Sequence, residues 1–236
     1  MSGRAPLRGG SLVLLSGGMD SATCLAIAAA SGGPVHTLSI VYGQRHARES
    51  ASARALARHY GVARHTVLTL PLGPLLRSAL TDRRQSVPRR PPRAASGTIP
   101  STYVPARNTI FLSIALGYAE SHGLDRIYLG VNAVDYSGYP DCRPEFLRAF
   151  GRLARLATRV GVEGGPAIRI VAPLLRLTKA QIVRRGARLG VPWELTWSCY
   201  LGGRRPCRSC DACRFRAKGF DGAGIPDPLG TSRAGG

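Results

Sequence analysis

The segment best suited to chemistry is Leu12–Ser21, where an apolar run ends in Ser-Gly-Gly-Met-Asp-Ser. Gly17 and Gly18 allow a tight turn and let the backbone approach an anion without a Cβ in the way. The backbone N–H groups that follow open a predicted helix, whose dipole favours negative charge. Ser16 and Ser21 add hydroxyl donors. The pattern predicts a phosphate-binding loop, and the alternative is an ordinary strand–turn–helix junction.

This loop is not of the Walker A type. A Walker A loop needs Gly-x-x-x-x-Gly-Lys-Ser/Thr, with a lysine that reaches the β and γ phosphates. No lysine precedes Lys179 in this chain. The sequence therefore indicates a different nucleotide loop.

Four cysteines near the C-terminus have the spacing of a metal site. Cys199, Cys207, Cys210 and Cys213 follow the pattern Cys-x7-Cys-x2-Cys-x2-Cys. Four thiolates with two short gaps are typical of tetrahedral Zn2+. An iron–sulfur cluster uses the same ligands, and free buried cysteines are a further alternative. Because all four ligand positions are filled, a structural role is predicted.

A polar and aromatic loop, 132–145, follows a predicted strand, which is where parallel sheets keep their chemistry. Its carboxylates and tyrosines suit a flat, donor-rich heterocycle, and Arg143 suits an anionic group. The residues concerned are Asp135, Tyr136, Tyr139, Asp141 and Glu145. The alternative is a solvated loop that caps the next helix.

Lys179 stands in the first turn of a helix that Thr178 is expected to cap. A cation beside the positive end of a helix is unfavourable, and a bound phosphate would offset it. A solvated surface lysine is the alternative.

The elements that position these groups alternate along the chain. After the first apolar run, strands are predicted over Val35–Tyr42, Val62–Leu70, Asp125–Val131 and Ile168–Ala172. Helices are predicted over Ser21–Ala30, His46–Tyr60, Leu72–Leu80, Glu145–Val160, and from Asn108 and Thr178 onward. Alternation of this kind predicts a Rossmann-like α/β fold with a parallel sheet and right-handed crossovers. Thr81–Pro100, with five arginines and four prolines, is expected to be a lid loop or a disordered insertion.

Composition limits the remaining possibilities. The chain has 236 residues and a formal net charge of +20, and only Lys179 and Lys218 among its basic residues are lysines. The arginines are spread along the chain, so compositional bias explains the charge as well as polyanion binding does, and specific nucleic-acid binding is not expected. No apolar stretch approaches a membrane span, and the clustered cysteines suit a reducing compartment, so a cytoplasmic protein is expected.

Several motifs together resemble a known family. Ser-Gly-Gly-x-Asp-Ser resembles the PP-loop of the N-type ATP pyrophosphatases, of the adenine nucleotide alpha hydrolase fold. Together with further motifs, this loop makes the chain similar to the QueC family of 7-cyano-7-deazaguanine synthases. These motifs are Tyr42-Gly43-Gln44, 103–108, 130–145, 177–179 and the Thr-Trp-Ser-Cys-Tyr stretch at 196–200. Met19 departs from the glutamine that is commoner in the family, at a position that contributes backbone.

The resemblance implies an activity and its cofactors. It implies conversion of 7-carboxy-7-deazaguanine and ammonia to the nitrile through an acyl-adenylate and an amide, with ATP, Mg2+ and Zn2+. A PP-loop ligase acting on another carboxylate or on tRNA, and a non-catalytic arginine-rich zinc module that binds nucleic acid, are the alternatives. A homodimer is expected.

The resemblance also implies site residues and domain bounds. The residues expected to be catalytic are Asp20, Ser21, Arg107 and Lys179. The nucleotide is expected to contact Leu15, Ser16, Gly17, Gly18, Met19, Asp20, Ser21, Ala22, Thr23, Cys24 and Leu25. The substrate is expected to contact Tyr103, Arg107, Asn108, Asn132, Asp135, Tyr136, Tyr139, Asp141, Arg143 and Glu145. The expected domains are 11–190 for the nucleotide and 191–220 for zinc, with flexible termini at 1–10 and 221–236.

Overall fold

A five-stranded parallel sheet with strand order β3-β2-β1-β4-β5 forms the centre of the computed structural model. The structure describes residues 9–43, 48–82, 84–88, 99–133 and 139–230. The strands are β1 Gly10–Leu14, β2 Val35–Val41, β3 Arg64–Thr69, β4 Leu124–Tyr128 and β5 Arg169–Val171. Each predicted strand is confirmed, with ends that differ by a few residues. All five residues of β1 are buried, because the central strand of a parallel sheet is covered on both faces.

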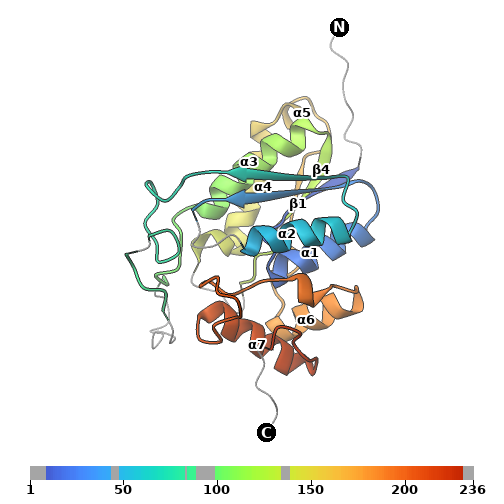
Figure 1. Ribbon diagram of the computed structural model, residues 1–236. Coiled ribbons are helices and arrows are strands. Elements are labelled where there is room, and N and C mark those ends of the chain that lie inside the picture. Colours follow the sequence, from blue (N-terminus) through green and yellow to red (C-terminus); the bar gives the residue numbers. More distant parts are fainter. Residues whose placement is uncertain (1–8, 44–47, 83, 89–98, 134–138, 231–236) are drawn as a thin grey trace.

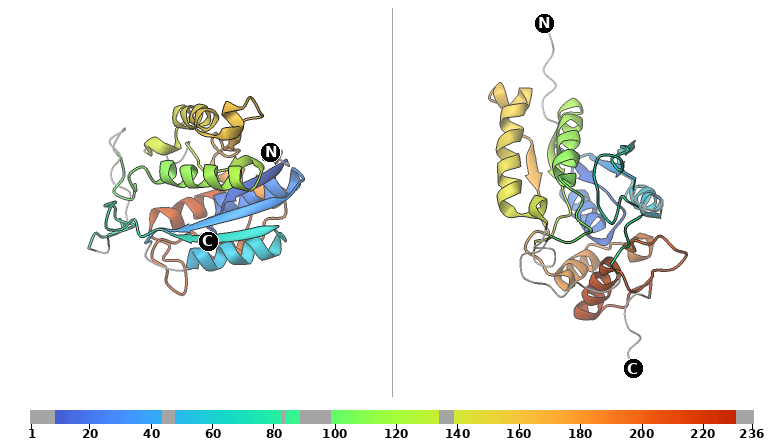
Figure 2. Two further views of the ribbon diagram at one scale, coloured as in Figure 1. Left: turned by 90° about the horizontal axis from the view of Figure 1, so that it is seen from above. Right: turned by 90° about the vertical axis from the view of Figure 1, so that its left-hand side faces the viewer.

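Helices cover both faces of the sheet (Figures 1 and 2). α1 (Met19–Ala30) and α2 (Arg48–His59) lie on one face, with α6 (Lys179–Arg188) and α7 (Asp211–Ala223) beyond them. α3 (Arg107–Ser121), α4 (Pro144–Ala157) and the short α5 (Arg159–Val162) lie on the other face. Two 3-10 turns, η1 (Pro140–Cys142) and η2 (Trp193–Leu195), complete the described elements. None of the helices in the described ranges is long and apolar enough to cross a bilayer.

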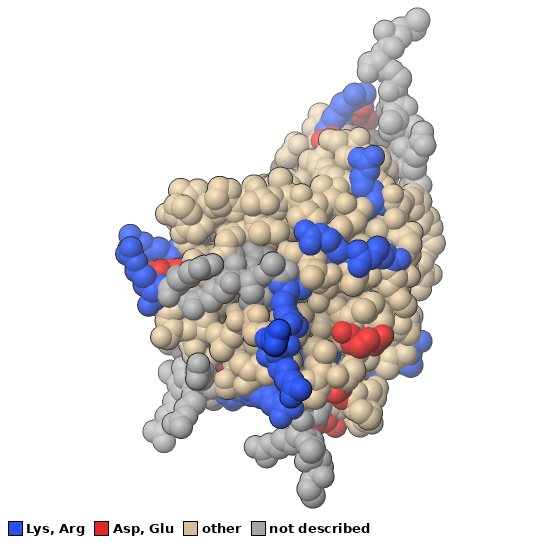
Figure 3. All heavy atoms as spheres, viewed as in Figure 1, with Lys and Arg blue, Asp and Glu red and all other residues tan. Residues whose placement is uncertain are grey.

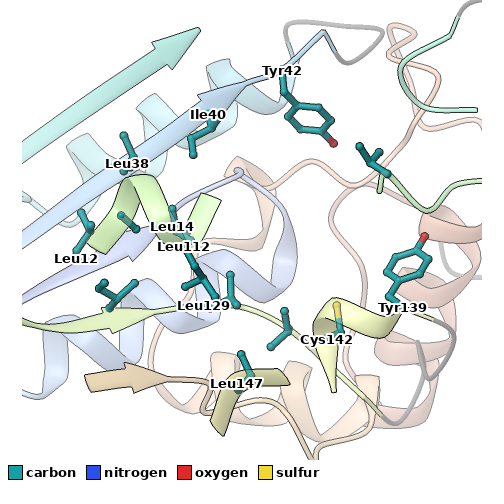
Figure 4. Packing of buried hydrophobic residues seen from close by; sticks show 14 of the residues in the cluster. Leu12, Leu14, Leu38, Ile40, Tyr42, Leu112, Leu129, Tyr139, Cys142 and Leu147 are labelled. Atoms are coloured by element: carbon teal, nitrogen blue, oxygen red, sulfur yellow. The ribbon is translucent and has the colours of Figure 1, made fainter. Parts of the chain in front are cut away.

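The larger core cluster lies on the α3 face of the sheet. It starts from Leu12 and Leu38 and ends, beyond the carboxyl ends of the strands, in Tyr42 and Tyr139 (Figure 4). The second cluster joins α1, α2, α6 and α7. The ends of β1 and β4 lie between the two clusters, at the edge of the sheet where ligands of parallel α/β folds bind.

The helix predicted over Leu72–Leu80 is wrong, because this segment forms turns. It contains Gly73-Pro74, and the residue before a proline is disfavoured in helical conformation. Thr81 Oγ1 donates to the Leu76 carbonyl at 2.6 Å and stabilises the turns instead.

The packed part of the chain continues past residue 220, where we expected a flexible terminus. α7 runs to Ala223, and the Asp227 side chain is fully buried against Arg216. The flexible-tail expectation is therefore wrong for the described residues 221–230. At the other end, Gly10 already belongs to β1.

Candidate functional site

The predicted phosphate loop joins β1 to α1, and its shape depends on two glycines. Gly17 has φ +87°, and a Cβ there would lie 2.3 Å from the Glu49 carbonyl oxygen of α2. Gly130, just after β4, lies against the start of α1, since a Cβ there would be 3.1 Å from the Asp20 carbonyl carbon and the Ser21 nitrogen. Both close approaches leave no room for a larger residue without movement of the loop.

Hydrogen bonds within the loop hold its serines. Ser21 Oγ donates to the Gly18 carbonyl at 3.0 Å and lies 3.1 Å from Ser16 Oγ. The Gly18 N–H donates to Ser16 Oγ at 3.3 Å. α1 begins after Gly18 without a side-chain cap, so its first N–H groups suit an anionic ligand.

Lys179 reaches this loop from α6. Its Nζ lies 2.5 Å from Asp20 Oδ2, and the lysine side chain is only 4% exposed. The alternative of a solvated surface lysine is therefore wrong. Thr178 caps α6 as predicted, in a capping box with Gln181. The other carboxylate oxygen, Asp20 Oδ1, is buried and has no hydrogen-bond partner among the described residues.

A cavity of about 290 Å³ opens beside this pair, where the strand order reverses between β1 and β4. Ligands of parallel α/β sheets bind at this point. The structure brings many of the predicted residues to its wall. They are Leu15, Ser16, Gly18, Met19, Asp20, Ser21, Arg107, Asn108, Asn132, Tyr139 and Lys179.

Other predicted nucleotide residues belong to the core. Ala22, Thr23, Cys24 and Leu25 are fully buried in α1 and do not line the cavity. Burial raises the pKa of the Cys24 thiol, which does not favour thiolate chemistry at this cysteine. Gly17 is also absent from the cavity wall and shapes the loop instead.

Several residues predicted to contact the heterocycle lie outside the cavity wall. Asp141 is buried, and its Oδ2 accepts from the Asn108 N–H at 2.9 Å, which caps the start of α3. Glu145 is exposed and pairs with Arg148 at 3.2 Å. Arg143 is exposed outside the cavity wall, and Tyr103 contacts the Tyr139 ring with centroids 5.7 Å apart. Asp135 and Tyr136 lie outside the described residues.

Cys142 also lines the cavity. Its Sγ accepts from Asn108 Nδ2 at 3.2 Å, and burial raises its pKa to about 11. A nucleophilic cysteine needs a lowered pKa, so this environment does not favour covalent thiol chemistry.

Several cavity residues were missed by the sequence reasoning. Tyr42, Glu49 and Trp197 line the cavity, and they lie just after β2, in α2 and in the segment before the cysteines. Burial raises the pKa of Glu49 to about 7, and the nearby Arg107 acts in the opposite direction. Tyr42 and Trp197 belong to motifs that carried the family resemblance, but no site role was assigned to them, and no local pattern marks Glu49.

The four predicted cysteines meet at one point. Their sulfur atoms all lie within 4.8 Å of one another, as tetrahedral coordination of one metal ion requires. Cys199, Cys210 and Cys213 are buried. The Cys207 N–H donates to Cys199 Sγ at 3.4 Å, and the Cys210 N–H donates to Cys207 Sγ at 3.3 Å. Thiolate ligands of a metal accept such bonds, so the cluster fits Zn2+.

A parallel sheet with a glycine loop, a carboxylate–lysine pair and a cavity at its switch point defines an α/β protein with the site of a nucleotide-dependent enzyme. The family model described as "Queuosine biosynthesis protein QueC" matches residues 10–224. The chain belongs to the QueC family, which confirms the resemblance of its motifs.

Curated relatives agree with this assignment. The chain is 59% identical over 219 residues to the 7-cyano-7-deazaguanine synthase of Anaeromyxobacter sp. (strain Fw109-5), covering 92% of this chain and 94% of the relative. It is 58% identical to the same enzyme of Anaeromyxobacter dehalogenans (strain 2CP-C), covering 92% and 93%. Among solved structures, NMN synthetase from Francisella tularensis matches with a TM-score of 0.49 at 18% identity, covering 94% of this chain and 79% of that chain.

Proposed function

We propose that the chain is a 7-cyano-7-deazaguanine synthase, an ATP-dependent ligase of queuosine biosynthesis. Its substrates are 7-carboxy-7-deazaguanine, ammonia and ATP. Family membership and identities of 58–59% to curated synthases support the proposal. The observation that carries it is the Asp20–Lys179 pair beside the open start of α1, because activation of a carboxylate by ATP needs a site for departing pyrophosphate.

The phosphates of ATP bind at the phosphate loop. Backbone N–H groups at the start of α1 donate to the phosphate oxygens. The hydroxyls of Ser16 and Ser21 donate to them as well, once the Ser21 O–H turns away from the Gly18 carbonyl and the Ser16 O–H turns away from Ser21. Lys179 supplies a positive charge that stabilises the pyrophosphate as it leaves. Its Asp20 contact keeps the ammonium group in place while the site is empty.

Asp20 also fits a Mg2+ ion. The buried Oδ1 atom without a partner is the kind of hard oxygen ligand that Mg2+ takes, together with phosphate oxygens and water. When bound, Mg2+ neutralises charge on the departing pyrophosphate.

The chemistry removes both oxygens of the substrate carboxylate. One carboxylate oxygen attacks the α-phosphorus of ATP and pyrophosphate leaves; ammonia then attacks the acyl-adenylate carbon, and AMP leaves with that oxygen. The amide oxygen repeats the attack on a second ATP. Loss of AMP and of the remaining nitrogen-bound protons yields the nitrile.

The heterocycle occupies the part of the cavity that Tyr42, Arg107 and Tyr139 line. Asn132, also on the cavity wall, is held by hydrogen bonds to the Leu174 and Leu177 carbonyls. Arg107 stabilises negative charge on the activated carboxylate. Asp135 and Tyr136 remain predicted contacts of the heterocycle edge.

Zn2+ at the four cysteines is structural in this proposal. Four sulfur ligands leave no position for substrate. The cytoplasm keeps such thiolates reduced, so we propose a cytoplasmic location. The homodimer stays a prediction, and light scattering of the purified protein measures the mass that tests it.

Isotope labelling tests the reaction. The purified protein is incubated with ATP, ammonium and 7-carboxy-7-deazaguanine labelled with 18O in both carboxylate positions, and the products are weighed by mass spectrometry. We expect the nitrile and AMP that carries one labelled oxygen. Unlabelled AMP, or turnover of ATP without nitrile, would contradict the proposal.

A further inference from the structure

Arg216 of α7 is the largest fully buried side chain among the described residues, and it carries a charge. Its Nε atom lies 3.0 Å from both carboxylate oxygens of Asp227, and its Nη2 atom donates to Oδ1 at 2.8 Å. Both side chains are at most 1% exposed. Apolar residues of similar size often stabilise a core as well as a buried ion pair does, so stability alone does not account for this one.

The remaining donors of Arg216 hold the turn that precedes the cysteine cluster. Nη1 donates to Thr196 Oγ1 at 2.6 Å, and Nη2 donates to the Trp193 carbonyl at 3.2 Å. Thr196 Oγ1 in turn donates to the Trp193 carbonyl at 2.6 Å. The guanidinium therefore sets the position of residue 196 from two directions.

The next residue contacts the phosphate loop. The backbone N–H of Trp197 donates to the Gly17 carbonyl at 2.9 Å, while its indole Nε1 donates to the Cys199 carbonyl at 3.0 Å. The Gly17 carbonyl and the Gly18 N–H belong to one planar peptide group and point in opposite directions. The bond from Trp197 therefore holds this peptide from its carbonyl side, while the Gly18 N–H donates to Ser16 Oγ on the other side.

We propose that the Arg216–Asp227 ion pair orients the phosphate loop for ATP, acting through Thr196 and the Trp197 N–H. Arg216, Thr196 and Asp227 are positioning residues in this proposal, which rests on the proposed ATP-dependent function. Glycine peptides rotate at low cost, so an external hydrogen bond is needed to keep the Gly17–Gly18 peptide in one orientation. The segment around Asp227 thereby becomes part of the nucleotide site.

The test compares two threonines that make the same kind of bond. Thr196→Val removes the hydroxyl that Arg216 holds. The control is Thr158→Val, because Thr158 is also buried and its Oγ1 donates to the Ala154 carbonyl at 2.7 Å, at the start of α5 and outside the cavity wall. For each variant we would measure unfolding in urea, bound zinc, and the Kd of a non-hydrolysable ATP analogue by titration calorimetry.

We expect both variants to lose stability and to keep their zinc. Thr196→Val should bind the ATP analogue about tenfold more weakly, the effect of losing one buried hydrogen bond. The KM for ATP should rise with it, while the KM for ammonia stays unchanged. Thr158→Val should bind the analogue like the wild type. Equal analogue affinity in the two variants would overturn the proposal.

Two further variants keep the test decisive if Thr196→Val folds poorly. Thr196→Ser retains the hydroxyl and should restore wild-type affinity. Asp227→Asn leaves the Arg216 charge without its carboxylate and should weaken ATP-analogue binding in the same way. In the double variant of Thr196→Val with Asp227→Asn, the two losses of binding free energy should not add. A wild type that binds the analogue but forms no nitrile would refute the proposed function alone, whereas nitrile synthesis with an unaffected Asp227→Asn would refute this inference alone.

Discussion

Asp20 has two carboxylate oxygens in different surroundings. Oδ2 holds the Lys179 ammonium group, and Oδ1 is buried with no partner among the described atoms. An oxygen desolvated without a partner is costly, and a metal ion or a ligand would relieve that cost. This single side chain therefore links the loop, the lysine and the proposed Mg2+ ion.

Replacing this carboxylate should stop turnover. We expect Asp20→Asn to lower kcat/KM for ATP by at least about a hundredfold, because charge stabilisation of the departing pyrophosphate is lost. Stability should fall by about 1–3 kcal/mol, since Lys179 stays buried without its carboxylate. The measurements are steady-state kinetics and urea unfolding. Asp125→Asn is the control, because Asp125 pairs with Arg126 at 3.0 Å outside the cavity wall. More than a tenth of wild-type activity in Asp20→Asn would contradict the assignment.

At the scale of the elements, the start of α1 depends on its close approach to the end of β4. A Cβ on Gly130 would lie within 3.1 Å of the α1 backbone at Asp20 and Ser21. Because backbone atoms cannot rotate away as a flexible side chain can, Gly130→Ala should displace the loop. We expect a loss of about 1–3 kcal/mol in stability, and a higher KM for ATP.

Gly117 in α3 provides the matched control for Gly130. A Cβ there meets nothing within 4 Å, and the residue is helical. Gly117→Ala should raise stability by about 0.4–1 kcal/mol and leave the KM for ATP unchanged. Equal behaviour of the two alanine variants would show that the β4–α1 approach does not position the loop.

The contact between β2 and α3 predicts a pH dependence of stability. His36 Nδ1 lies 3.2 Å from the Tyr118 hydroxyl, and the His122 ring lies edge-on with centroids 5.6 Å apart. Burial, followed by the charges of His122 and Arg64, lowers the pKa of His36. As the pH falls, the unfolded chain therefore takes up a proton at this histidine at a higher pH than the folded protein does.

The sign of the effect follows from that lowered pKa. The contribution of His36 should be complete above the ordinary histidine pKa of about 6.5 and should decline as the pH falls from there toward the folded value. Urea unfolding between pH 5 and 8 measures it. His36→Gln should reduce the slope of the unfolding free energy against pH without removing it, because the pKa of His65 is also lowered. Identical slopes in the variant and the wild type would contradict this origin.

At the scale of the whole molecule, the cysteine cluster joins the C-terminal segment to the sheet. Three of its cysteines belong to the main core cluster, together with Trp197. Metal analysis should find one Zn2+ per chain. Cys210→Ser should lose the metal and about 2–5 kcal/mol of stability, the range for a lost cross-link. Cys24→Ala is the control, because Cys24 is a buried cysteine outside the cluster, and this variant should keep its zinc. Iron with a charge-transfer absorption would indicate an iron–sulfur cluster instead.

The net charge of +20 is also a property of the whole molecule. On the face in Figure 3, basic side chains form a run below the centre and separate groups elsewhere. We expect weak, sequence-independent binding of DNA or tRNA, with a Kd of about 10⁻⁴–10⁻⁶ M at physiological salt and a steep salt dependence. Added tRNA should leave nitrile formation unchanged. Filter binding at two salt concentrations measures this, and nanomolar, sequence-selective binding would favour a tRNA substrate.

The sequence by itself determined what depends on neighbours in the chain. The glycines and serines of the phosphate loop, the Thr178 cap and the cysteine spacing are local patterns, and local backbone geometry follows from them. The alternation of apolar runs with helical periodicity was enough to predict the five strands and the parallel sheet, because each element must bury one face. The family resemblance rested on the same short motifs.

Tertiary structure alone decided which distant residues meet. Lys179 and Asp20 are 159 positions apart, and their contact arises from the packing of α6 beside α1. Other packing contacts did the same elsewhere: η1 against α3 made Asp141 a helix cap, and the fold brought Glu49 of α2 and Trp197 to the cavity. Residue type shows what a side chain can bind, whereas its partner depends on the direction in which the folded backbone points it. No local pattern carries that direction, so the Arg216–Asp227 pair and its bond path to the phosphate loop emerged only from the fold.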